Sequence, residues 1–255
     1  MGRKKQRKKR INANRIELLI IIMLVFFIKK TDIIPSILSV NKNYIEEKSL
    51  DDYGYPEELL DMLSRNEEMI DYVLDYPNKK GEVYADTIDN VKKGEMPLLL
   101  QYDKGWGYGI YGDKVLAITG CGPTSLSMVI AKLVGSNEVT PYQVAKYAEE
   151  NGYYVAGKGT SWDLFTEGSR CFGIEGEEIP LSKELIFNVL DSGRPIICSV
   201  RPGDFTTTGH IIVLNKIKGG KIQVYDSNSK ERSSRLWEYE RLEGQIKNLW
   251  AFSLI

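Results

Sequence analysis

The sequence predicts a domain of the α+β class in the C-terminal part of the chain, and two patterns predict it. Apolar residues recur at helical spacing directly after Cys121, at Leu126, Val129, Ile130, Leu133 and Val134. Two runs rich in β-branched residues, 209–214 and 221–226, flank Gly219 and Gly220, which is typical of an antiparallel hairpin. We therefore expect helices packed against a twisted antiparallel sheet.

The N-terminal segment, 1–40, is expected to be a basic head and a membrane anchor. Residues 1–15 carry eight basic and no acidic side chains, although the whole chain balances 34 basic with 35 acidic residues. An apolar run over 18–28 follows directly, and Lys29 and Lys30 end it. This order is similar to a signal anchor, and the positive-inside rule places the rest of the chain outside the cytoplasm. We expect a single-pass protein of the bacterial cell membrane and no nucleic-acid partner.

A cleaved signal peptide is the alternative for this segment. The apolar run is shorter than the roughly 20 residues that a spanning helix requires, which would make the protein secreted. No small-x-small cleavage site follows closely, and Ile33, Ile34 and Ile37 extend the apolar character. Retention of the anchor is therefore favoured.

Residues 41–94 are expected to form a polar linker and an amphipathic helical arm. Glu57 and Glu58 follow Pro56, as suits the positive end of a helix dipole. Apolar residues then recur at helical spacing before Pro77: Leu59, Leu60, Leu63, Met69, Ile70, Val73 and Leu74. The arm either packs on the C-terminal domain or regulates it as a pro-segment.

The sequence around Cys121 places a thiol at the start of a helix. Gly120 and Gly122 flank the cysteine and leave room for a substrate, and Pro123 suits the first helical turn. Unpaired amides and the helix dipole favour the thiolate at such a position. The whole chain holds one histidine, His210, so a cysteine–histidine mechanism has one possible base.

Two turns are compatible with the hairpin that follows His210. In a three-residue turn over 217–219, Asn215 pairs with Lys221 and His210 lies opposite Asp226, whose carboxylate would orient the imidazole. We predict this turn. A two-residue Gly219-Gly220 loop would instead shift the register by an odd number.

That shifted register would place His210 opposite Ser229 and turn Asp226 to the other face. Asn228 is then the alternative residue to orient the imidazole.

Gln101 is the candidate for stabilising an oxyanion. Attack of a thiolate on a carbonyl develops negative charge on oxygen, and a side-chain amide beside the Cys121 backbone N–H would stabilise it by roughly 3 to 4 kcal/mol.

The two other cysteines, Cys171 and Cys198, indicate neither a disulfide framework nor a second nucleophile. No cluster of Cys, His and carboxylates has zinc spacing, so we expect no metal and no cofactor.

Taken together, five blocks of the chain resemble papain-clan cysteine peptidases, in the branch related to bacteriocin-leader-processing peptidases. The blocks are Gln101-Tyr102-Asp103, Gly120 to Ser125, Gly159 to Trp162, Pro202 to Thr206 with Gly209-His210, and Asp226 to Ser229. The resemblance covers residues 95–255, which we take as the peptidase domain. It implies a papain-like fold and hydrolysis of peptide bonds in a peptide or protein substrate.

The resemblance also implies a role for each of four residues. Cys121 would be the nucleophile, His210 the base, Asp226 the orienting residue and Gln101 part of the oxyanion hole. Leader-processing peptidases usually accompany an exporter, but no Gly-rich phosphate loop with Gly-Lys-Ser/Thr is present. The identity of the substrate therefore does not carry over.

Trp162, Gly120 and Gly209 are the predicted substrate-binding residues, since aromatic and glycine residues commonly line peptide clefts. Two other functions stay open. One is a peptidoglycan-cleaving amidase of the same fold, and the other is a catalytically inactive peptide-binding module. The sequence does not predict an oligomeric state.

Overall fold

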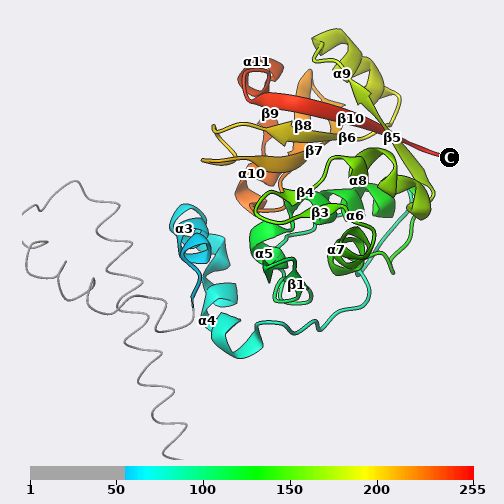
Figure 1. The fold of residues 1–255 in the computed structure, drawn as a ribbon. Coiled ribbons are helices and arrows are strands. Elements are labelled where there is room, and N and C mark those ends of the chain that lie inside the picture. Colours follow the sequence, from blue (N-terminus) through cyan, green and yellow to red (C-terminus); the bar gives the residue numbers. More distant parts are fainter. Residues whose placement is uncertain (1–54) are drawn as a thin grey trace, which may run out of the picture. The chain divides into compact units, whose positions relative to one another are not determined.

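The structure, a computed structural model, describes residues 55–255 (Figure 1). The chain divides into two compact units, Met1–Pro77 and Asn78–Ile255. The predicted basic head and anchor lie outside the described residues. None of the helices between residues 55 and 255 has the length and apolar character that crossing a bilayer requires.

The described part of the first unit is helical, as the apolar spacing predicts. Its elements are α3 (Glu57–Arg65), η2 (Glu67–Met69) and the beginning of α4 (Ile70–Lys79). The predicted end before Pro77 is wrong, because α4 continues through this residue to Lys79. A proline in the last turn removes only one backbone hydrogen bond, so the helix tolerates it there.

The second unit is built on a six-stranded sheet in which all neighbouring strands are antiparallel (Figure 1). The strand order is β5-β10-β6-β7-β8-β9. The strands are β5 (Ile174–Ile179), β10 (Ile246–Leu254), β6 (Ile196–Val200), β7 (His210–Lys218), β8 (Lys221–Tyr225) and β9 (Leu236–Trp237). This confirms the α+β class.

Helix α6 (Cys121–Leu133) packs on one face of this sheet, against β7 and β10, and α7 (Pro141–Glu150) packs against α6. Every residue of α6 from Gly122 to Lys132 is buried. Thr140 caps α7 by accepting a hydrogen bond from the Gln143 backbone N–H at 3.2 Å. The helix that carries Cys121 is therefore central in the domain.

The remaining helices are short or lie on the other face of the sheet. They are α5 (Leu116–Thr119), α8 (Asp163–Thr166), η3 (Gly168–Phe172), α9 (Lys183–Asp191), α10 (Lys230–Ser234) and α11 (Tyr239–Leu242). Two small hairpins precede α8: β1 (Ile110–Tyr111) with β2 (Lys114–Val115), and β3 (Tyr154–Val155) with β4 (Gly159–Thr160).

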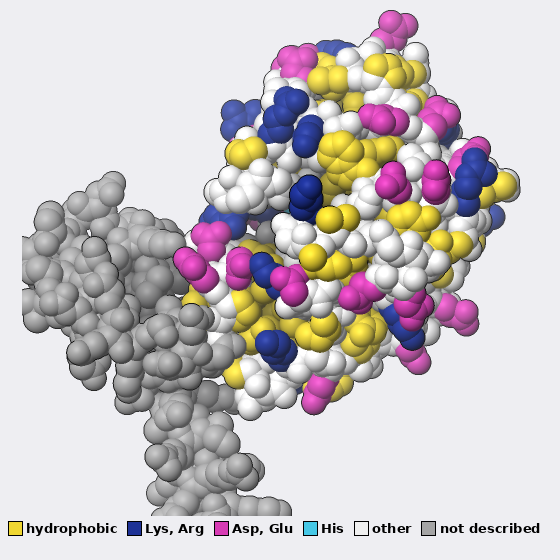
Figure 2. Space-filling view, in the orientation of Figure 1, with side chains coloured by type: hydrophobic (Ala, Val, Ile, Leu, Met, Phe, Trp, Pro, Cys, Tyr) yellow, Lys and Arg dark blue, Asp and Glu magenta, His cyan; other side chains and the backbone are white. Residues whose placement is uncertain are grey.

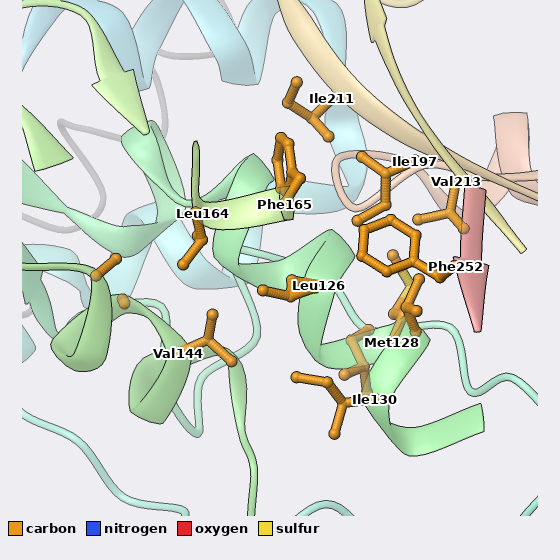
Figure 3. Close-up of a cluster of buried hydrophobic side chains, with 14 of the residues drawn as sticks. Leu126, Met128, Ile130, Val144, Leu164, Phe165, Ile197, Ile211, Val213 and Phe252 are labelled. Carbon is orange, nitrogen blue, oxygen red and sulfur yellow. The ribbon is translucent and has the colours of Figure 1, made fainter. Parts of the chain in front are cut away.

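The sheet separates two hydrophobic cores. Figure 3 shows the first, in which Leu126 and Met128 of α6 face Phe165, Val213 and Phe252. The second core joins α9 and α11 to the opposite side chains of the sheet, among them Ile212, Leu214, Ile222 and Val224. On the face drawn in Figure 2, basic, acidic and apolar side chains are interspersed.

The hairpin between β7 and β8 differs from the predicted one. Lys218 pairs with Lys221, so the loop consists of Gly219 and Gly220, with φ of 57° and 76°. Two successive residues with positive φ favour glycine at both positions and match the right-handed twist of the strands. The predicted three-residue turn is wrong.

The predicted consequence of a two-residue loop is also wrong, because β7 contains a bulge. Leu214 pairs with Val224 and Lys216 with Gln223, so Asn215 is an extra residue in the ladder. Ile217, after the bulge, contacts the same core as Leu214 before it. The bulge thus reverses which residues of β7, odd-numbered or even-numbered, point to each face of the sheet.

Because of this reversal, Leu214 pairs with Val224 on one face of the sheet. His210 alternates in phase with Leu214, and Asp226 alternates in phase with Val224. His210 is the first residue of β7, and Asp226 directly follows the last residue of β8. The two side chains therefore meet at one end of the sheet, although the turn is not the one predicted.

Candidate active site

A cavity of about 460 Å³ opens between the start of α6, the β3–β4 hairpin and the start of β7. Cys121 and His210 both line it, together with Thr160, Trp162 and Gly209. The helix and the sheet each contribute one reactive side chain to the same cavity.

Cys121 is the first residue of α6 and is half-buried. Its two neighbours are glycines because neighbouring atoms pack where a side chain would otherwise lie. A Cβ at Gly120 would lie 2.4 Å from the Leu116 carbonyl oxygen, and one at Gly122 would lie 2.8 Å from Thr160 Oγ1. Gly120 does not line the cavity, since α5 packs against it where a side chain would otherwise project.

His210 lies between Asp226 and Cys121. Its Nε2 is 2.7 Å from Asp226 Oδ1, and its ring also hydrogen-bonds the Cys121 side chain. Burial lowers the pKa of His210, but the Asp226 carboxylate and the bonds to Asp226 and Cys121 outweigh burial and raise it well above its ordinary value. Since Nε2 faces Asp226, Nδ1 is the ring nitrogen left for the thiol.

Asp226 is completely buried and remains ionised. Burial raises the pKa of this carboxyl, but the charges and hydrogen bonds of His210 and Arg232 outweigh burial and hold it below its ordinary value. Arg232 Nε donates to Asp226 Oδ2 at 2.5 Å, and the Asn228 backbone N–H donates to Oδ1 at 2.8 Å. Asn228, the alternative orienting residue, thus contacts Asp226 through its backbone.

Sequence reasoning missed Arg232, which the short helix α10 positions. Ser229 begins this helix by accepting a hydrogen bond from the Arg232 backbone N–H at 3.1 Å. Ser233 Oγ accepts from the Asp226 backbone N–H at 2.9 Å and donates to the Ser229 carbonyl at 2.7 Å. The available signal was a serine cap after Asp226, with an arginine three residues beyond the cap.

Gln101 is buried beside the start of the Cys121 helix. Its Nε2 donates to the Ala117 carbonyl in α5 at 2.7 Å, and its Oε1 accepts from Ser227 Oγ at 2.9 Å. The amide nitrogen carries a second N–H besides the one used for Ala117. Gln101 is not among the residues that line the cavity.

Of the predicted substrate-binding residues, Trp162 and Gly209 line the cavity. Trp162 is 37% exposed, its ring packs edge-on against Trp250 at 5.3 Å, and Lys247 Nζ lies 4.9 Å above it. Tyr154 and Asp113 also line the cavity. The Tyr154 hydroxyl donates a hydrogen bond to Asp113, and the Tyr154 ring packs over Gly112.

The other two cysteines have different surroundings. Cys198 is fully buried, and burial raises the pKa of its thiol far above the ordinary value. Cys171 is exposed as a residue, but the protein atoms on one side of its thiol partly desolvate the sulfur and raise its pKa. Within residues 55–255, no group of His, Cys, Asp and Glu side chains is arranged to bind a metal ion.

A helix-borne cysteine beside a histidine and a buried aspartate on an antiparallel sheet defines the papain type of cysteine peptidase. The model of the Peptidase_C39-like family matches residues 93–252. The chain therefore belongs to this family and is a cysteine-type peptidase. No curated protein matches it.

Several solved structures match this chain, including the following two. One is the peptidase domain of Streptococcus ComA, described as a bi-functional ABC transporter involved in a quorum-sensing pathway; the match has 22% identity and a TM-score of 0.41, and covers 54% of this chain and 93% of that one. The other is a C39-like peptidase from Bacillus anthracis, with 15% identity, a TM-score of 0.36, and 65% and 96% coverage.

Proposed function

We propose that this protein is a membrane-tethered, extracytoplasmic cysteine peptidase that cleaves peptide bonds with Cys121, His210, Asp226 and Gln101. The observation that carries the proposal is the position of His210, bonded at Nε2 to buried Asp226 and facing Cys121 in one cavity. An ionised carboxylate on one ring nitrogen makes the other the acceptor of the thiol proton.

The reaction begins with proton transfer from Cys121 to His210. The sulfur attacks the carbonyl carbon, and His210 returns the proton to the leaving nitrogen as the C–N bond breaks. Water then gives a proton to His210 and attacks the thioester, and cleavage of the C–S bond restores the cysteine. The Cys121 N–H and the second amide N–H of Gln101 are the proposed donors to the oxyanion.

The membrane location rests on the sequence alone. Eight basic residues in 1–15 and the apolar run after them would retain the chain in the membrane with the peptidase domain outside. Protease added to intact cells should then degrade the peptidase domain. Full-length protein in the soluble cytosolic fraction would exclude both the anchor and its orientation.

The peptidase activity is tested by incubating the full-length chain with a peptide library and, separately, with cell-wall fragments. Peptide cleavage that is lost in Cys121→Ser and His210→Ala supports the proposal. Release of wall peptides alone would identify the amidase alternative. A peptide-based thiol-reactive probe that fails to label Cys121 would indicate the inactive binding module.

A further inference from the structure

The face of the sheet on which His210 lies is not specified by hydrophobic alternation. Ile211 and Val213 contact one core, while Ile212 and Leu214 contact the other. Residues 210–215 are all buried. When a strand is apolar on both faces, burial stabilises it about equally in one register and in the register shifted by one residue. Another feature of the structure must therefore select the register.

The bulge at Asn215 is that feature, because it reverses the alternation between the hairpin loop and His210. Without the extra residue, the pairing of Lys218 with Lys221 would continue regularly and place His210 opposite Ser229. Asp226 would then alternate to the opposite face. The contact between His210 and Asp226 therefore depends on the bulge.

Lys132 binds this bulge from the helix. Its Nζ donates to the Asn215 carbonyl oxygen at 3.2 Å and to Asn215 Oδ1 at 3.0 Å. Asn215 Nδ2 in turn donates to Gln223 Oε1 on β8 at 3.2 Å. Both hydrogen bonds of Lys132 within the described part of the chain thus go to the one residue that breaks the ladder.

The surroundings of Lys132 are unusual for a lysine. The residue is 8% exposed, and burial together with the charge of Lys216 lowers the pKa of its ammonium to about 8. A buried ammonium costs free energy unless it is hydrogen-bonded, so its oxygen acceptors at the bulge are needed. An apolar residue would suit the helix position better if packing were its only role.

We propose that Lys132 is a positioning residue for His210, which fixes the bulge at Asn215 and with it the face of the sheet on which the imidazole meets Asp226. Helix α6 begins with Cys121 and carries Lys132 eleven residues later, about 16 Å along its axis. The same helix thus carries the Cys121 thiol at its first residue and, near its end, the lysine that sets the register of the strand β7 on which His210 lies. The catalytic part of this proposal rests on the proposed function.

The test is the titration of His210 in the full-length chain, followed by NMR with labelled histidine. The chain has one histidine, so its signal needs no assignment by mutation. In Lys132→Met, the bulge at Asn215 is no longer bound by the helix, so His210 should separate from Asp226. The pKa of His210 should then fall toward its ordinary value of about 6.5. The value of kcat/KM should fall about a hundredfold. Lys218→Met, on the exposed end of the same strand, should change neither quantity.

Asn215→Ala is the second variant, and it decides the question if Lys132→Met does not fold. It keeps the backbone carbonyl acceptor and removes Oδ1, so the pKa of His210 should move in the same direction by a smaller amount. A folded variant of either kind in which His210 titrates as in the unsubstituted chain overturns the proposal. If the unsubstituted chain cleaves no peptide, the proposed function fails, while the titration still tests the role of Lys132.

Discussion

Ser227 Oγ donates a hydrogen bond of 2.9 Å to Gln101 Oε1, and the Gln101 backbone N–H donates to the Ser227 carbonyl at 2.8 Å. The hydroxyl occupies the oxygen end of the Gln101 amide, so the nitrogen end must face Ala117 and the start of the Cys121 helix. Because Ser227 directly follows Asp226, one loop orients both the proposed oxyanion donor and the residue that binds His210.

Ser227→Ala should lower kcat about tenfold with little change in KM, because Gln101 loses the contact that selects its amide orientation. The measurement is steady-state turnover of a cleaved peptide, with a thermal melt for each variant. Ser234→Ala removes an exposed hydroxyl bonded to the Glu231 carbonyl and is the matched control. Unchanged kcat in folded Ser227→Ala would mean that Gln101 needs no such orientation.

Asp226→Asn should lower kcat by about three to four orders of magnitude, because a neutral amide does not stabilise the imidazolium and can select the wrong tautomer. Asn228→Ala should have a much smaller effect, since Asn228 contacts Asp226 through its backbone N–H. His210→Ala should abolish acylation. If Asn228→Ala loses activity while Asp226→Asn keeps it, the orienting role belongs to Asn228.

Arg232→Met should make the protein more sensitive to acid. The pKa of Asp226 lies below its ordinary value in the folded state, so its ionisation stabilises the fold above the unfolded-state pKa of about 3.9, and this stabilisation is lost as the pH falls through the folded-state pKa. Removal of Arg232 raises the folded-state pKa, and the loss should begin at higher pH.

The measurement is the midpoint of unfolding as a function of pH below about 5. Arg235→Met, which removes a half-exposed arginine three residues away, is the control. If the unfolding midpoint depends on pH in the same way in Arg232→Met and in the unsubstituted chain, Arg232 does not stabilise the ionised carboxylate of Asp226.

Cys121 should be alkylated faster than the other two cysteines at neutral pH. It lines the cavity and hydrogen-bonds His210, whereas burial raises the pKa of both Cys171 and Cys198. The rates are measured site by site by mass spectrometry after brief exposure to iodoacetamide. The advantage of Cys121 should disappear in His210→Ala. Equal rates at all three sites in the native protein would remove the physical basis for Cys121 as nucleophile.

Local patterns in the sequence predict the elements of the domain and part of its site. Spacing and glycine content predict the helix after Cys121, the helical arm except for its end beyond Pro77, and the β7–β8 hairpin except for its turn. These signals act between residues close in the chain. The single histidine likewise limits the candidate base to His210. The basic head and apolar run predict an anchor that lies outside the described residues.

The tertiary structure alone decides how these parts meet. The turn is the two-residue loop, and His210 nevertheless reaches Asp226 because the bulge at Asn215 reverses the alternation of β7. Lys132, 83 positions from Asn215, binds this bulge. Ser227 reaches Gln101 across 126 positions, and packing against Leu116 gives Gly120 its role. Hydrophobic spacing carries no information on such contacts, since a strand that is apolar on both faces accepts either register.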